Sequence, residues 1–152
     1  MDSFLKTIQL PIMWLLIAIF VAFYPMLISI YVFLPLFIGL MGYMMINGIE
    51  KGRWSYIFVS LIYFINLEAN LSLPFFLTVI ATLLVYVLFY HNLGYFRRCA
   101  ICAPVITVFL IDMLYLGIIL GYDFIFQTQS IILDKILLYS LIVDILIVVI
   151  FV

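Results

Sequence analysis

The sequence predicts an all-α membrane protein with six transmembrane helices and both termini in the cytoplasm. Three observations support this prediction: the apolar composition, the lengths of the uncharged segments and the distribution of basic residues. Of 152 residues, 70% are hydrophobic and 9% are charged, and the mean hydropathy is +1.47. Soluble domains carry about 25% charged residues, so these few charges cannot cover a surface in water. The chain is therefore expected to form one polytopic membrane domain over residues 1–152.

The uncharged segments divide into six spans, of which the first and third are somewhat shorter than the roughly 20 apolar residues that a bilayer requires. The N-terminal apolar run has no small-residue cleavage site, so it is expected to remain as the first span. The stretch 10–46 carries no charge and is long enough for two helices. Pro25 is its expected break and Pro35 an expected kink, because proline removes a backbone donor and disfavours helix in the preceding residue. The predicted spans are 7–24, 26–47, 54–67, 71–90, 99–121 and 132–152.

The basic residues set the orientation of these spans. With the N-terminus inside, five of the six basic residues face the cytoplasm and only Lys135 lies outside. Positive charge in short loops favours the cytoplasmic side. If 10–46 were a single span, the best arrangement would place four basic residues inside and two outside, so the charge distribution favours six spans. The net charge of −1 indicates no nucleic-acid partner.

Two aspartates interrupt apolar spans, in "FLIDMLYLG" (Asp112) and "LIVDILIVV" (Asp144). An Asp at a helix centre costs about 2.5 to 3.5 kcal/mol on insertion, so such residues usually face protein. In antiparallel neighbouring spans, Asp112 lies about 20 Å above the inner end and Asp144 about 18 Å below the outer end. In a hydrocarbon core about 30 Å thick, these depths differ by about 8 Å, so the two carboxyls can approach each other.

Two interpretations of this pair stay open. In the structural one, both carboxyls face protein, form hydrogen bonds with residues such as Tyr115 and Thr107, or contact a helix of another subunit. In the other, they form a proton site or a catalytic dyad. No Lys or Arg is predicted at this depth, so at least one carboxyl is expected to be a neutral acid that donates a hydrogen bond.

The other polar residues offer little catalytic chemistry. Cys99 and Cys102 have the spacing of a redox pair, but thiols at the inner membrane face are expected to stay reduced. His91 is the only histidine, which excludes a haem held by two histidines of this chain. No nucleophile motif or phosphate-binding glycine loop occurs. We therefore expect no catalytic, metal-binding or cofactor-binding residues, and no enzyme.

The segment "GRWSYIFVSLIYFINLEANLSLPFFLTVIATLLVYVLFY", within this six-span layout, resembles the MreD family of bacterial rod shape-determining membrane proteins. Members of that family end span three in an acidic residue before a short turn, and Glu68 stands at this position. The resemblance in residue pattern covers about residues 50–90. Glycines that the family has in span three are replaced here by Ser60, Tyr63 and Phe64.

The resemblance implies a fold similar to the substrate-binding subunits of energy-coupling-factor transporters. It also implies a non-enzymatic scaffold of the bacterial inner membrane that maintains rod shape with MreC and the peptidoglycan-synthesising elongation complex. Asp112 and Asp144 match no motif of the family. Arg97 and Arg98 are expected to touch cytoplasmic partners or anionic lipid headgroups. The candidate contact or intramembrane polar residues are Glu68, Asn70, Arg97, Arg98, Asp112 and Asp144.

Other functions fit the same topology. One is a small-molecule, vitamin-type binding subunit of a transporter, whose polar outer pocket would use Glu68, Asn70, Asp123, Gln127 and Gln129. Another is an intramembrane enzyme that uses the two aspartates, although the asparagine-rich motifs of aspartyl lipoprotein signal peptidases are absent. A subunit of a different membrane machine also remains open.

Overall fold

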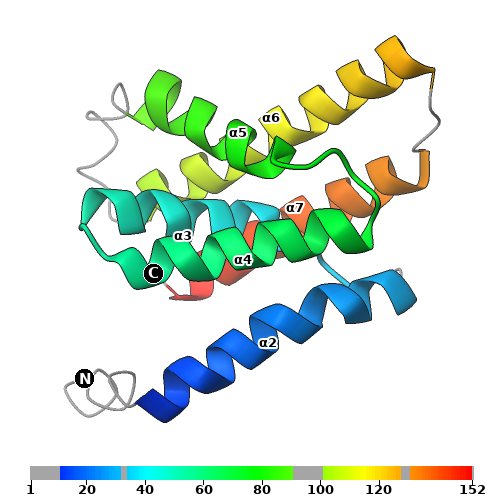
Figure 1. Cartoon of the computed structure of the whole chain (residues 1–152). Coiled ribbons are helices and arrows are strands. Elements are labelled where there is room, and N and C mark those ends of the chain that lie inside the picture. The colour runs from blue at the N-terminus through cyan, green and yellow to red at the C-terminus, as the bar shows by residue number, and fades with distance from the viewer. Residues whose placement is uncertain (1–10, 32–33, 91–100, 128–130, 152) are drawn as a thin grey trace.

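The computed structural model describes residues 11–31, 34–90, 101–127 and 131–151, and every regular element within them is a helix. Consecutive helices alternate in direction along the chain (Figure 1). The all-α class that the sequence predicts is confirmed. The elements are α2 (Pro11–Ile30), α3 (Ile38–Glu50), α4 (Trp54–Asn70), α5 (Leu77–Val85), the π-helical turn η1 (Tyr86–Tyr90), α6 (Cys102–Phe126) and α7 (Ile131–Phe151).

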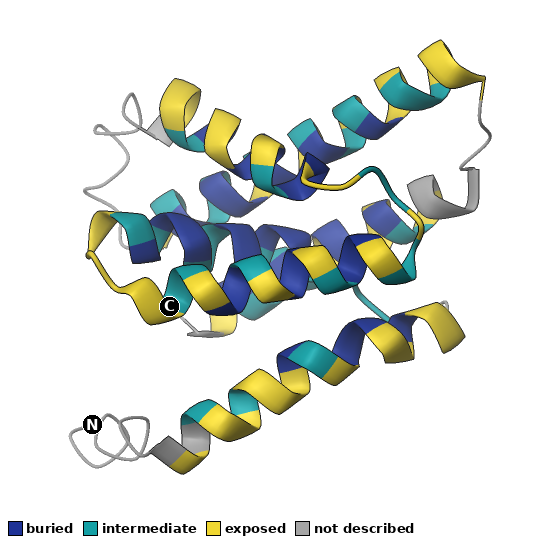
Figure 2. Ribbon diagram, viewed as in Figure 1, coloured by how far each residue is buried: buried dark blue, intermediate teal, exposed yellow. Residues whose placement is uncertain are grey.

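Helix α3 is the centre of the bundle. It packs against α4, α5, α6 and α7, whereas α2 packs against α4 at the edge (Figure 1). Buried residues gather on the helix sides that face α3, and the outer side of α2 is exposed (Figure 2). No large hydrophobic side chain of α3 is among the exposed ones, in keeping with its central place.

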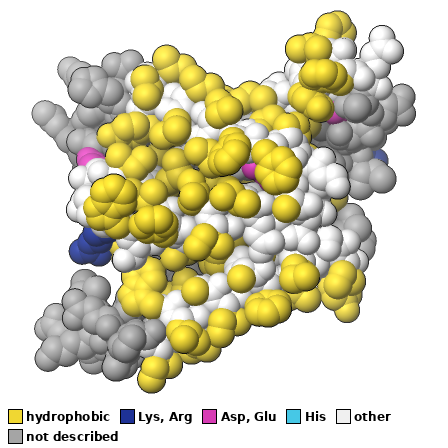
Figure 3. Space-filling model, in the orientation of Figure 1, with side chains coloured by type: hydrophobic (Ala, Val, Ile, Leu, Met, Phe, Trp, Pro, Cys, Tyr) yellow, Lys and Arg dark blue, Asp and Glu magenta, His cyan; other side chains and the backbone are white. Residues whose placement is uncertain are grey.

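One described helix, α6, is long and apolar enough to cross a membrane, with 25 residues and a hydropathy of 2.3 in its most apolar window. The segments Trp14–Ile30 and Leu77–Phe89 are shorter apolar helices. Large hydrophobic side chains are exposed on α2, α4, α5, α6 and α7, and they cover much of the face in Figure 3. A surface of this kind suits contact with lipid or with other membrane helices.

The break between the first two helices lies at Pro35 and not at Pro25, which corrects the prediction from the sequence. Pro25 is inside α2, and the helix continues to Ile30. The chain then leaves the helical conformation before α3 begins at Ile38. Helix α5 also begins later in the sequence than predicted: it begins at Leu77, whereas the predicted span begins at 71. Both breaks depend on hydrogen bonds from other elements, which local proline chemistry does not reveal.

Candidate functional site: two helix breaks held by buried acids

The two breaks share a sequence pattern and a backbone conformation. "LPLF" at 34–37 precedes α3, and "LPFF" at 73–76 precedes α5. The last residue of each, Phe37 or Phe76, is the N-cap and has a positive φ, 51° and 65° respectively. A bulky residue rarely adopts this conformation, and its side chain offers no hydrogen-bond acceptor for the first N–H groups of the helix. Another part of the molecule must supply the acceptors.

Glu68, in the last turn of α4, supplies them for α5. Its Oε2 accepts the N–H of Phe76 at 2.6 Å. Its Oε1 accepts the N–H of Thr78 at 2.8 Å and the Thr78 hydroxyl at 2.7 Å. Glu68 is fully buried within the bundle. A carboxylate here is also favoured by the positive end of the helix dipole.

Helix α7 supplies the acceptors for α3. Asp144 Oδ2 accepts the N–H of Gly39 at 3.0 Å and that of Leu40 at 3.4 Å. One turn earlier on α7, the Ser140 hydroxyl accepts the N–H of Leu36 at 2.9 Å. These residues are 104 or 105 positions apart in the chain. The N-terminus of α3 is therefore fixed by the end of the sequence.

Two tyrosines bind the carbonyl groups of the same break. Tyr24 of α2 donates its hydroxyl to the carbonyl oxygen of Pro35 at 2.9 Å, and Tyr63 of α4 donates to that of Leu36. Buried backbone groups outside a helix need hydrogen-bond partners of this kind. Three helices thus enclose the break before α3.

Asp112 of α6 lies at this break as well. A Cβ atom added to Gly39 would lie 2.6 Å from Asp112 Oδ2, and the N–H of the same glycine binds Asp144. Gly39 therefore lies beside both carboxyl groups. Asp112 is 6% exposed and Asp144 is fully buried, which agrees with the prediction that both face protein.

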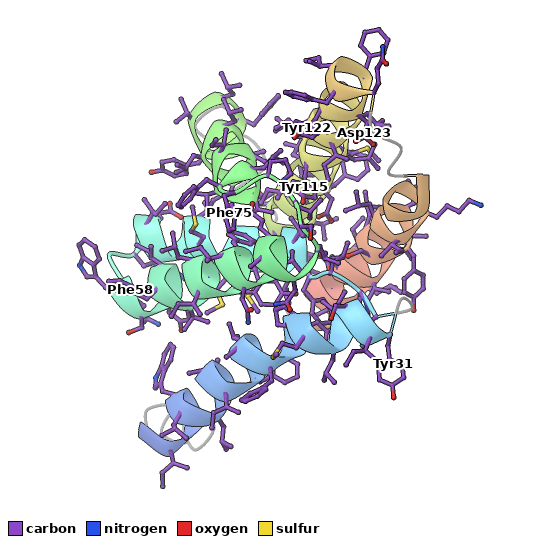
Figure 4. The ribbon with its side chains drawn as sticks, turned by 45° about the vertical axis from the view of Figure 1, so that its right-hand side comes forward. Tyr31, Phe58, Phe75, Tyr115, Tyr122 and Asp123 are labelled. Carbon is purple, nitrogen blue, oxygen red and sulfur yellow. The ribbon has the colours of Figure 1, made fainter. Side chains whose placement is uncertain are left out.

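The partners of the aspartates differ from those that the sequence suggests. Asp144 binds main-chain N–H groups, whereas the Thr107 hydroxyl donates to the carbonyl of Ala103 at 2.7 Å in its own helix. The Tyr115 hydroxyl is buried and has no hydrogen-bond partner among the described residues. Tyr115 lies among the helices in Figure 4, where Tyr31 and Phe58 project outward.

Four buried polar side-chain atoms lack a hydrogen-bond partner in the described part of the chain. Two of them are the carboxyl oxygens Asp112 Oδ2 and Asp144 Oδ1, and the others are the hydroxyls of Ser60 and Tyr115. Both oxygens of Glu68, in contrast, are bonded. Unused acceptor capacity is therefore concentrated at the break before α3.

Asn70 has a structural role within the bundle. Its amide donates to the main-chain and side-chain carbonyls of Asn66, at 2.7 and 2.8 Å, and the Asn66 amide in turn donates to the carbonyl of Ala22 on α2. Glu68 is likewise bonded to the N-terminus of α5. Two candidates for a vitamin-binding outer pocket, Glu68 and Asn70, thus form hydrogen bonds within the chain. Gln127 is exposed just after α6.

Several candidates from the sequence cannot be placed. Arg97 and Arg98 lie outside the described residues, as do His91, Cys99 and Gln129. Cys102 is disulfide-bonded, which contradicts the expectation that it is reduced. Within the described ranges, no group of three His, Cys, Asp or Glu residues is arranged to hold a metal ion. Comparison with protein-family models, characterised protein sequences and solved structures found no match for the chain.

Proposed function

We propose that this chain is a non-enzymatic, multi-pass subunit of a complex in the bacterial inner membrane, acting as an MreD-like scaffold in cell elongation with an MreC-like partner. The observation that carries the proposal is the use of the buried acids. Glu68 and Asp144 bind main-chain N–H groups of their own chain, so these carboxylates hold helices in place. The resemblance over about residues 50–90 supplies the choice of complex.

Such a subunit would meet its partners mainly through apolar helix faces. Helix α2 offers the widest of these, because it packs chiefly against α4 and leaves its other sides open (Figure 2). Aromatic and large aliphatic side chains are enriched where proteins bind one another. The exposed large hydrophobic residues of α2 are Ile12, Leu15, Leu16, Ile19, Phe20, Phe23, Met26, Leu27 and Ile30.

The same proposal includes six membrane spans, cytoplasmic termini and a fold similar to the substrate-binding subunits of energy-coupling-factor transporters. The alternating helix directions and the charge distribution support the six spans. Reporter domains fused after Lys51 and Arg97 should be active in the cytoplasm, and those near Asn70 and Gln127 in the periplasm. An odd number of spans would reverse part of this pattern and contradict the topology.

The scaffold function is tested by purifying the tagged chain in mild detergent from its own host. We expect the MreC-like protein of that cell to co-purify, and rod-shaped cells to become round when the chain is depleted. Replacing Phe20 and Phe23 together by Ala should reduce this recovery several-fold. The matched control replaces Phe124 and Ile125, which are also exposed but lie at the end of α6. Unchanged shape on depletion, without recovery of the partner, would contradict the proposal.

A small-molecule binding subunit is the competing function. It predicts a vitamin-type compound in the purified protein, detectable by mass spectrometry after denaturation. It also predicts that cells lacking the chain keep their shape but require the compound in the medium. That pair of results would replace the scaffold proposal.

A further inference from the structure

The carboxyl pair at the break before α3 has acceptor capacity that the described hydrogen bonds do not use. Asp144 Oδ2 binds two main-chain N–H groups, but Asp144 Oδ1 and Asp112 Oδ2 are buried without a partner. A buried carboxylate oxygen without a donor is costly. Two such carboxyls beside one glycine call for a hydrogen-bond donor that they share.

Positive charge does not neutralise this pair within the described part of the chain. The basic residues found there, Lys51, Arg53 and Lys135, are all exposed. Like charge and desolvation both favour the neutral form of a buried carboxyl. Asp112 and Asp144 are therefore not expected to be ionised together.

The titratable side chains that bind this break from α2 and α4 are phenols. Tyr24 of α2 and Tyr63 of α4 donate their hydroxyl protons to main-chain carbonyls of the break. The carboxylate of Glu68, also on α4, is bonded instead to the N-terminus of α5. The pair is thus left with Asp112 and Asp144 as its acid and its base.

A proton suits this place better than a metal ion. The N-terminus of α3 presents N–H donors and the positive end of a helix dipole, which favour negative charge and oppose a cation. A carboxyl group beside a carboxylate carries one net negative charge, which matches the helix end. The hydrogen on one carboxyl then provides the donor that the other lacks.

We propose that Asp112 and Asp144 form a binding site for one exchangeable proton in the apolar interior, with Asp112 as the protonated donor and Asp144 as the ionised cap of α3. Gly39 makes the site possible, because a Cβ atom there would lie 2.6 Å from Asp112 Oδ2 and 2.7 Å from Val108 Cγ1. Loss of the proton would place a second negative charge beside the first. A second proton would remove the charge that caps α3. Occupancy of the site therefore controls how firmly α3 is held between α6 and α7, whatever complex the chain joins.

The test is infrared spectroscopy of the purified chain in lipid vesicles at neutral pH, using the carbonyl stretch of protonated carboxyl groups. We expect one protonated carboxyl per chain among its seven Asp and Glu side chains. Carbon-13 in the aspartate carboxyls should shift this band, which separates it from glutamate. Asp112→Asn should abolish the band, and Glu50→Gln, at the opposite end of α3, should leave it unchanged.

Absence of the band from the wild-type chain, or its survival in a folded Asp112→Asn variant, would overturn the proposal. If Asp112→Asn does not fold, Asp144→Asn serves instead, because it changes the acceptor of the Asp112 proton and should shift the band without removing it. An unshifted band in that variant would also overturn the site.

Replacing sodium by choline should change neither the band nor the unfolding temperature. A sodium-dependent change would identify a bound cation and reject the proton.

Discussion

The breaks before α3 and α5 start from the same pattern, "LPLF" and "LPFF", and are completed by different means. The break before α5 is completed by Glu68, which lies eight to ten residues from the groups it binds and uses both oxygens. The break before α3 is completed by Ser140 and Asp144, more than a hundred residues away, and one oxygen of Asp144 stays unused.

This difference separates a structural role for a buried acid from a chemical one. Glu68 meets three donors, and both of its carboxylate oxygens accept hydrogen bonds. Asp144 meets two donors on one oxygen and has Asp112 beside it, so this break retains both an acid and a base. Equal burial thus does not mean equal function, and the number of satisfied oxygens distinguishes the two sites.

Glu68→Ala should have the largest effect. It leaves the N–H groups of Phe76 and Thr78 and the Thr78 hydroxyl without this acceptor, and each buried donor left unpaired costs about 1–3 kcal/mol. We expect the free energy of unfolding to fall by about 3–5 kcal/mol, with a marked loss of membrane abundance. Glu68→Gln keeps the size and one acceptor oxygen, so it should lose about half as much. Thermal unfolding in detergent measures both, and wild-type stability of the Ala variant would rule out the cap.

Asp144→Leu should have the second-largest effect. We expect the free energy of unfolding to fall by about 2–4 kcal/mol, because the N–H groups of Gly39 and Leu40 lose their acceptor. Asp144→Asn retains an acceptor oxygen at the same place and should lose about 1 kcal/mol or less. Unfolding temperatures of the two variants are to be compared in the same detergent. Equal losses for Asn and Leu would mean that the charge, and not the acceptor oxygen, holds α3.

Gly39→Ala should cost about 1–3 kcal/mol, since the new methyl group overlaps Asp112 and Val108 and the packed site must open. Gly117→Ala on α6 is the matched control: no atom lies within 4 Å of its added Cβ, so it should be neutral or stabilising by up to about 1 kcal/mol. The comparison is made by thermal unfolding. Equal effects at the two glycines would show that close packing at Gly39 is unimportant.

Ser140→Ala should have the smallest effect, about 1 kcal/mol, because only the N–H of Leu36 loses its acceptor. Thr107→Ala removes a hydroxyl that binds within its own helix and should change stability by less than about 0.5 kcal/mol. Hydrogen exchange at the Leu36 amide provides a local readout. Unchanged protection of that amide in Ser140→Ala would contradict the hydrogen bond.

Regular features of the molecule were predictable from the sequence. Composition and apolar segment lengths give the helical class, because a bilayer allows few other solutions. The approach of Asp112 and Asp144 also follows from the sequence, since both lie on long helices with a fixed rise per residue. Their burial agrees with the separate prediction that both face protein.

The breaks were not predictable in the same way. Pro25 is the more obvious interruption, yet α2 runs through it, and the chain breaks at Pro35 where distant tyrosine, serine and aspartate side chains satisfy the backbone. The acceptors for α3 come from α7, and no local sequence pattern predicts them. One signal was present: two L-P-x-F segments occur, each shortly before a helix. At both places the final Phe is the N-cap and has a positive φ.

The distance in sequence between α3 and its cap has a consequence for how the chain is made. Glu68 and the helix that it caps are synthesised almost together, so the α4–α5 hairpin can complete its hydrogen bonds soon after it is made. The N-terminus of α3 is synthesised more than a hundred residues before Asp144. During translation at about 5–20 residues per second, several seconds or longer pass before the final acceptor of these N–H groups is synthesised. Other hydrogen-bond acceptors, such as water, must bind them in that interval, and any truncation before α7 prolongs it indefinitely.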